Sequence, residues 1–99
     1  MDFEVKKEGL TAYFTFMLDK VDFYVIRNME KDLISKFENC SKIVFNMENT
    51  EIIASAFIRL CLEAIQRVGK DNFEIINAGS FVKTVLHISK FDTFVKVSE

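Results

Sequence analysis

The spacing between apolar residues changes along this chain, and that change restricts the fold more than any other feature of the sequence. Residues 3–6 alternate apolar with polar side chains, which is the period of a half-buried strand. Gly9 then permits a turn. Residues 10–18 are rich in aromatic and β-favouring side chains, so they predict a second strand that pairs with the first as a hairpin.

After the hairpin the apolar spacing becomes helical. Asp19 and Asp22 lie at the start of this segment, where free N–H groups and the helix dipole favour a carboxylate. Lys36 lies near the end, where the opposite charge is favourable. The apolar side chains at helical spacing are Val25 or Ile26, Met29, Leu33 and Phe37. We therefore predict one amphipathic helix that ends near Lys36.

The rest of the chain alternates strands with helices. In order, the patterns predict a strand covered on both faces at 43–45, a helix at 55–68 ended by Gly69, a strand at 73–76, a helix that starts at 78–80, and an edge strand at 94–97. Strand pairs joined through helices form parallel sheets. We therefore expect the α/β class, with residues 1–99 forming a single domain. Its mixed sheet would have four to five strands, with helices mainly on one face.

Composition permits a buried core and argues against several functions. Hydrophobic residues make up 49% of the 99 residues, and eleven of them are Phe. The thirteen basic residues are interleaved with fifteen acidic ones, so no cluster could neutralise a nucleic-acid backbone. The N-terminus lacks the basic flank and apolar run of a signal peptide, and every apolar stretch is far too short to span a bilayer. We expect a cytoplasmic protein that binds no nucleic acid and does not insert into a membrane.

The sequence offers no group of residues suited to catalysis or metal binding. Cys40 and Cys61 are too few for a disulfide framework and wrongly spaced for zinc, so we expect buried reduced thiols. His87 is the only histidine and lacks clustered partners, so we expect it to be structural. Gly79-Ser80 could contact an anion, but such residues are common at helix starts. We expect no enzyme activity, cofactor or metal.

Two stretches carry a resemblance to a known family. Residues 43–60 follow a buried strand, an Asp-Leu-Ser-like loop and an Ile-Asp-Ser-Ser-Gly-Leu-Gly segment that opens a helix. Residues 73–94 follow a strand-Asn, Val-x-x-Val-Leu and Leu-Asp-x-x-Phe succession, and Leu18-Asp19 is similar to Gly-Glu-Leu-Asp. In this order and spacing the chain resembles the STAS domain of bacterial anti-sigma-factor antagonists.

The resemblance implies a regulatory protein that binds another protein. In such antagonists the first Ser of Asp-Ser-Ser-Gly is phosphorylated by a kinase that is itself the anti-sigma factor, and the unphosphorylated antagonist binds that kinase and frees the sigma factor. The matching residue here is Ser55. The Asp, second Ser and first Gly of the motif are replaced by Ala54, Ala56 and Phe57, so only the phosphorylatable hydroxyl is kept.

Two of these positions have alternative interpretations. Ser55 either caps the second helix or is a phosphorylation site, where a phosphate would meet free N–H groups. In that helix we expect Ile58, Cys61, Leu62 and Ile65 to face the sheet, Arg59, Glu63, Gln66 and Arg67 to face water, and Phe57, Leu60 and Ala64 to lie along the flank. The flank either fills gaps against a neighbouring helix or binds a partner. In the second case, Phe57→Asp would weaken binding and leave the fold nearly intact.

The leading hypothesis is a partner-switching module in transcription regulation. Its docking face would comprise the Asp19 loop, the Thr50 loop and the start of the second helix, with Ser55, Ala56, Phe57 and Leu60. The expected partner is an anti-sigma factor or a related kinase-like protein, and a homodimer is compatible with the sequence. The alternatives are a STAS-type subunit of a membrane transport assembly and a domain that binds a small apolar ligand.

Overall fold

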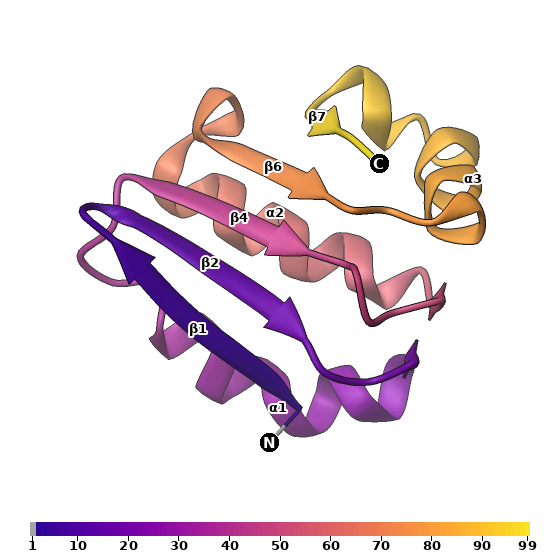
Figure 1. Cartoon of the computed structure of the whole chain (residues 1–99), viewed down its shortest axis with the longest axis horizontal. Helices are drawn as coiled ribbons and strands as arrows, with labels where there is room; N and C mark the ends of the chain where they lie inside the picture. Colours follow the sequence, from indigo (N-terminus) through magenta and orange to yellow (C-terminus); the bar gives the residue numbers. More distant parts are fainter. Residues whose placement is uncertain (1) are drawn as a thin grey trace.

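The computed structural model describes residues 2–99, which form a five-stranded sheet, a two-stranded sheet and three α-helices (Figure 1). This confirms the predicted α/β class. The strands are β1 Phe3–Glu8, β2 Thr11–Phe16, β3 Lys20–Val21, β4 Lys42–Asn46, β5 Ile52–Ile53, β6 Phe73–Ile76 and β7 Lys96–Val97. The helices are α1 Phe23–Ser35, α2 Ala56–Val68 and α3 Ser80–Ile88, with 3-10 turns η1 Lys70–Asn72 and η2 Phe91–Thr93.

The large sheet has the strand order β1-β2-β4-β6-β7. β1 and β2 form the predicted antiparallel hairpin, in which Phe3 pairs with Phe16. Gly9 occupies the turn with φ +61°, a backbone conformation that glycine adopts without steric cost. The pairs β2–β4, β4–β6 and β6–β7 are parallel, so the sheet is mixed as predicted. The carboxyl ends of β2, β4 and β6 therefore meet at one edge of the sheet (Figure 1).

The two faces of the large sheet differ in polarity. α1 and α2 lie behind the sheet in Figure 1, and the strand residues on that face are apolar. The opposite face carries charged side chains. Glu74 lies there between two lysines, with Oε1 at 3.5 Å from Lys42 Nζ and Oε2 at 3.9 Å from Lys96 Nζ. Val44 is on this polar face, beside Tyr13 in the ladder, and is nevertheless fully buried. Side chains of its neighbours on the sheet, rather than a helix, must therefore cover it.

Phenylalanine side chains form the centre of the core. Phe45 of β4 contacts five other rings at centroid distances between 4.9 and 6.2 Å. These rings come from both neighbouring strands, from α2 and from the segment after α1: Phe14, Phe16, Phe37, Phe57 and Phe73. Several pairs are edge-to-face, the arrangement that the ring quadrupole favours. Phe45 thus connects the sheet to its helical layer.

The first helix begins where the acidic residues indicated. The Asp22 carboxylate accepts a hydrogen bond from the Val25 N–H at 3.0 Å, so Asp22 is the N-cap and Asp19 lies in the preceding loop. The buried residues of α1 are Ile26, Met29 and Leu33. Phe37 follows the end of the helix but still packs into the core.

Both cysteines are free thiols. Cys61 is buried in α2, and burial raises the pKa of its thiol well above the ordinary value. Cys40 is half-buried, its sulfur lies 2.9 Å from the Phe37 carbonyl oxygen, and burial raises its pKa as well. A thiol with a raised pKa stays protonated at neutral pH and is a poor nucleophile.

The aromatic core gives the first prediction. Phe45→Ala should lower the free energy of unfolding by about 3–5 kcal/mol, because it removes the ring on which five others pack. Urea denaturation followed by circular dichroism would measure the loss. The matched control is Phe94→Ala, since Phe94 is about half exposed and should cost less than about 1 kcal/mol. Equal losses in the two variants would contradict this account of the core.

Candidate docking face

Two loops that are far apart in the sequence are joined at the carboxyl edge of the sheet. β3 and β5 pair in parallel, which places Lys20 beside Ile52 and Val21 beside Ile53. The Thr50 hydroxyl donates to the Leu18 carbonyl oxygen at 2.8 Å. Backbone hydrogen bonds join the loops further. The N–H groups of Glu51 and Ile52 both donate to the Asp19 carbonyl oxygen, and the Ala54 N–H donates to that of Val21. The Asp19 and Thr50 loops are therefore one connected surface that leads into α2.

The position of Thr50 corrects its expected role. Thr50 is only 4% exposed, and its hydroxyl is already bonded to the Leu18 carbonyl oxygen. Asp19 is exposed, and its own carbonyl oxygen accepts two of the inter-loop bonds. Thr50 thus holds the two loops together from the buried side, whereas the Asp19 side chain is exposed.

Ser55 lies at the start of α2 and is exposed, but it does not cap the helix. An N-cap residue has an extended backbone that lets its side chain reach the next free N–H groups. Ser55 instead has helical angles, φ −58° and ψ −28°, and its side chain makes no capping hydrogen bond. The capping interpretation is therefore wrong. The first turn is closed by backbone bonds, from Phe57 N–H to Ala54 and from Ile58 N–H to Ser55.

The flank of α2 is part of the core, so the expected partner surface there is corrected. Phe57 and Leu60 are 0% exposed, and the Phe57 ring packs 5.5 Å from that of Phe16. The residues buried in α2 are Phe57, Leu60, Cys61 and Ala64, each one position before the predicted Ile58, Cys61, Leu62 and Ile65. The helix is thus rotated by about 100° from the predicted orientation. Ala56 is half-buried beside Ser55, and Leu62 is 44% exposed.

Exposed apolar side chains occur near the start of α1 and in β5. Phe23 and Tyr24 are 48% and 72% exposed, and their rings contact each other at 5.6 Å. Ile52 of β5 is partly exposed in the same loop assembly. The sequence pattern indicates no role for these residues, although Phe23-Tyr24 directly follows the Asp22 cap. Contiguous patches of exposed apolar side chains are typical of protein-binding surfaces, whereas single exposed ones are common on any protein.

A polar network closes the carboxyl ends of β2, β4 and β6. The Asn77 side-chain amide donates to Asn46 Oδ1 at 2.9 Å, and Asn46 donates to Glu48 Oε1 at 2.7 Å and to Thr15 Oγ1 at 3.3 Å. Asn77 has φ +55°, a left-handed conformation in which Asn is enriched. The Asn46 loop is therefore fixed relative to the segment that enters α3.

A pocket of about 450 Å³ lies beside this network. Three carboxylates line it, those of Asp19, Glu48 and Glu51, together with the partly exposed ring of Phe81 from α3. No Lys, Arg or His of residues 2–99 lines the pocket, and none forms an ion pair with these carboxylates. The pocket is thus negatively charged and favours a cationic group over an anion. Ser55 does not line it.

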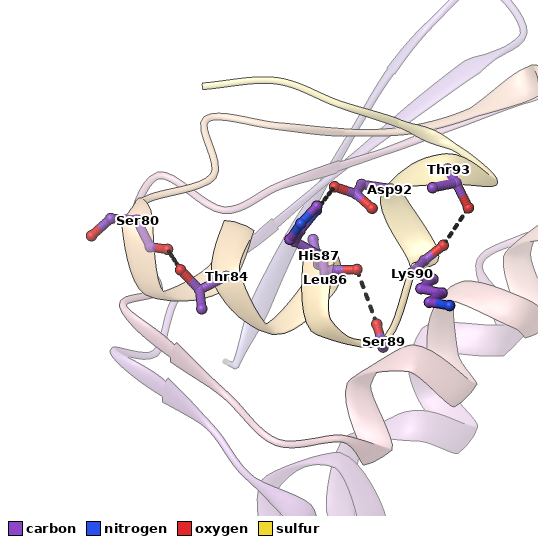
Figure 2. Close-up of polar contacts among 8 residues, drawn as sticks. All are labelled: Ser80, Thr84, Leu86, His87, Ser89, Lys90, Asp92 and Thr93. Carbon is purple, nitrogen blue, oxygen red and sulfur yellow. Dashed lines mark hydrogen bonds and ion pairs between the residues drawn. The ribbon is translucent and has the colours of Figure 1, made fainter.

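Side chains of α3 and of the η2 turn that follows it form hydrogen bonds within this segment. His87 Nδ1 lies 2.9 Å from Asp92 Oδ2, and Figure 2 shows the two side chains facing each other. His87 is exposed and lies in the last turn of α3. The hydroxyls of Thr84, Ser89 and Thr93 each donate to a backbone carbonyl, those of Ser80, Leu86 and Lys90. In the described part of the chain, no three His, Cys, Asp or Glu side chains are grouped to hold a metal ion. No helix within residues 2–99 has the length and apolarity needed to cross a bilayer.

The chain shares its fold with several solved structures that are described as anti-sigma-factor antagonists. The chain is similar to an anti-sigma-factor antagonist (STAS) domain protein from Planctomyces limnophilus, with a TM-score of 0.89 and 16% identity over 100% of this chain and 91% of that one. An anti-sigma factor antagonist from Mycobacterium paratuberculosis is similar with a TM-score of 0.81 and 13% identity, over 97% of this chain and 83% of that one. The anti-sigma factor antagonist SpoIIAA in its unphosphorylated form is similar with a TM-score of 0.80 and 13% identity, over 98% of this chain and 88% of that one.

These likenesses show that the chain has the STAS fold, as its sequence predicted. The sequence matches no model of a protein family, and no curated protein matches it. The similarity is therefore one of structure, at identities where few individual side chains correspond.

The Asn77 conformation gives a matched pair of variants. Asn77→Ala should lower the free energy of unfolding by about 1–2 kcal/mol, since it loses the bond to Asn46 and strains a left-handed residue. Asn77→Gly loses the same bond without the strain, so it should be more stable than the alanine variant by roughly 1 kcal/mol. Urea denaturation would compare them. Equal stability of the two variants would exclude a contribution from the backbone conformation.

The burial of Phe57 reverses the outcome expected from the sequence. Phe57→Asp should unfold the protein, because an unpaired carboxylate would replace a ring that is fully enclosed by Phe16 and Phe45. Circular dichroism at increasing temperature would detect the loss of the transition. Leu62→Asp on the exposed side of the same helix is the control, and it should unfold cooperatively near the wild-type temperature. A folded Phe57→Asp variant would refute this placement of α2.

Proposed function

We propose that this protein is a regulatory binding module that acts as an anti-sigma-factor antagonist and is switched by phosphorylation of Ser55. The observation that carries the proposal is the exposed, non-capping hydroxyl of Ser55 at the edge of an ordered surface. The fold supports the general role, since its structural neighbours are antagonists of this kind. The partner would be an anti-sigma factor or a related kinase-like protein.

We define the docking face as Asp19, Phe23, Ile52, Ser55 and Ala56. Its two loops are tied by hydrogen bonds within the chain, so little conformational freedom is lost on binding. Phe23 and Ile52 supply exposed apolar area, and the neighbouring acidic pocket would accept a basic side chain of the partner. The face thus combines an apolar zone near Ser55 with a charged zone at Asp19.

Phosphorylation would change the apolar zone without breaking the fold. The Ser55 hydroxyl caps nothing, so its modification costs the helix no capping bond. A phosphate adds about −1.5 to −2 charges at this position. Desolvating that charge against an apolar or acidic partner surface is unfavourable. Binding of the partner and modification of Ser55 would therefore exclude each other.

The binding half of this proposal can be tested with three variants. Ser55→Asp should weaken binding to the kinase-like partner by about tenfold or more in isothermal titration calorimetry, because it introduces a charge into the contact. Ser55→Ala should bind like wild type. Ser89→Asp places the same charge on an exposed serine beyond α3 and should also bind like wild type. Unchanged binding of Ser55→Asp would exclude Ser55 from the docking face.

The modification half needs the kinase itself. Incubation of the wild-type chain with its partner kinase and ATP should place a phosphate on Ser55, identified by mass spectrometry of proteolytic fragments. Ser55→Ala should then take up no phosphate. Phosphate found only on other residues would refute the proposed switch while leaving the binding role intact.

A further inference from the structure

We propose that Arg59 is the intramolecular partner of a phosphate on Ser55, and that this pairing draws Arg59 away from Glu30. The inference rests on the phosphorylation proposed above and concerns what happens inside the modified protein. Arg59 stands where the Ile-Asp-Ser-Ser-Gly-Leu-Gly segment of the family has its second Gly. A guanidinium in this position is therefore a feature of this chain.

The local geometry brings the two side chains to one face of α2. Because Ser55 already has helical backbone angles, Ser55 and Arg59 are related as residues i and i+4 of one helix. Cβ atoms at that spacing are about 5–6 Å apart. Side chains in a helix also lean toward its N-terminus, so the long side chain of Arg59, which now contacts Glu30, can swing to reach Ser55. Both residues are exposed, and no rearrangement of the core is needed for them to meet.

The present partner of Arg59 is a weaker ligand than a phosphate. Arg59 Nη2 lies 2.8 Å from Glu30 Oε2 of α1, and both side chains are solvent-accessible. Exposed ion pairs of this type contribute little. A phosphate carries more charge than a carboxylate and has three acceptor oxygens, which suit the planar donors of a guanidinium. It is also attached to the same helix as Arg59, whereas Glu30 belongs to a neighbouring one.

Transfer of Arg59 would connect the modification to the α1–α2 contact. Glu30 would lose its only cationic partner among residues 2–99, and the ion pair that ties the two helices would weaken. The phosphate would be held against the surface of α2 rather than projecting freely into solvent. It would also meet the helix N-terminus, which favours a negative charge in every variant and must be controlled for.

The test uses the full chain with phosphoserine encoded genetically at position 55, so no kinase is required. A ³¹P NMR titration measures the second dissociation constant of the phosphate. Arg59 stabilises the dianion, so it should lower this pKa, and Arg59→Gln should decrease the dissociation constant by about 2- to 5-fold. Arg67→Gln, on the same helix but three turns from Ser55, should leave the dissociation constant unchanged and controls for helix charge.

Glu30→Gln provides a second and independent variant. This substitution frees Arg59 from its carboxylate partner. With Arg59 present, it should therefore increase the second dissociation constant of the phosphate. In the Arg59→Gln variant, the same substitution should have a smaller effect on that constant. The inference is overturned if Arg59→Gln leaves the titration unchanged, or if Arg67→Gln shifts it equally. Failure of the partner to bind the protein would not alter these titrations, so the two proposals fail separately.

Discussion

The parallel alignment of β2, β4 and β6 determines where each part of the proposed docking face lies. The strand order advances in one direction across the sheet, and parallel connections are almost always right-handed. Helices α1 and α2 must then cover the same face of the sheet and begin at the same edge. This alignment brings the β3 loop, the β5 loop and the start of α2 together, although they are separated in the sequence (Figure 1). It also leaves the opposite face without helices, which explains its charged side chains.

The elements themselves could be predicted because each has a clear local signal. The hairpin follows from its alternation and Gly9, and α1 follows from the Asp22 cap and three buried residues at helical spacing. The rotation of α2 could not be predicted in the same way. Its apolar residues surround most of the helix, so two orientations one residue apart bury comparable side chains. The choice between them depends on Phe16 and Phe45, whose rings enclose Phe57 and leave Leu62 partly exposed.

The sequence predicts a docking face on the Asp19 loop, the Thr50 loop and the start of α2, and the docking role itself stays a prediction. Asp19, Thr50 and Ser55 do belong to one connected assembly, because β3 pairs with β5. No sequence pattern indicates a two-residue strand, so that pairing depends on tertiary contacts. The helical backbone of Ser55 is likewise set by how the chain leaves β5, not by its own side chain. Asn77 did carry a signal, since Asn after a strand is one of the few residues that tolerate a left-handed backbone.

The hydroxyls of Thr50 and Ser55 have different structural roles, and this difference shows how such a surface could be switched without loss of stability. Thr50 uses its hydroxyl to hold the Leu18 carbonyl and is buried, so its modification would break one of the hydrogen bonds between the loops. Ser55 is exposed and caps nothing, so a group added there replaces no capping interaction of the folded state. The free-energy cost of a phosphate would then fall on the bound complex, where the charge must be desolvated, rather than on folding. An arginine one turn along the helix would reduce even the residual cost to the free protein, because it supplies the phosphate with a partner that belongs to the same chain.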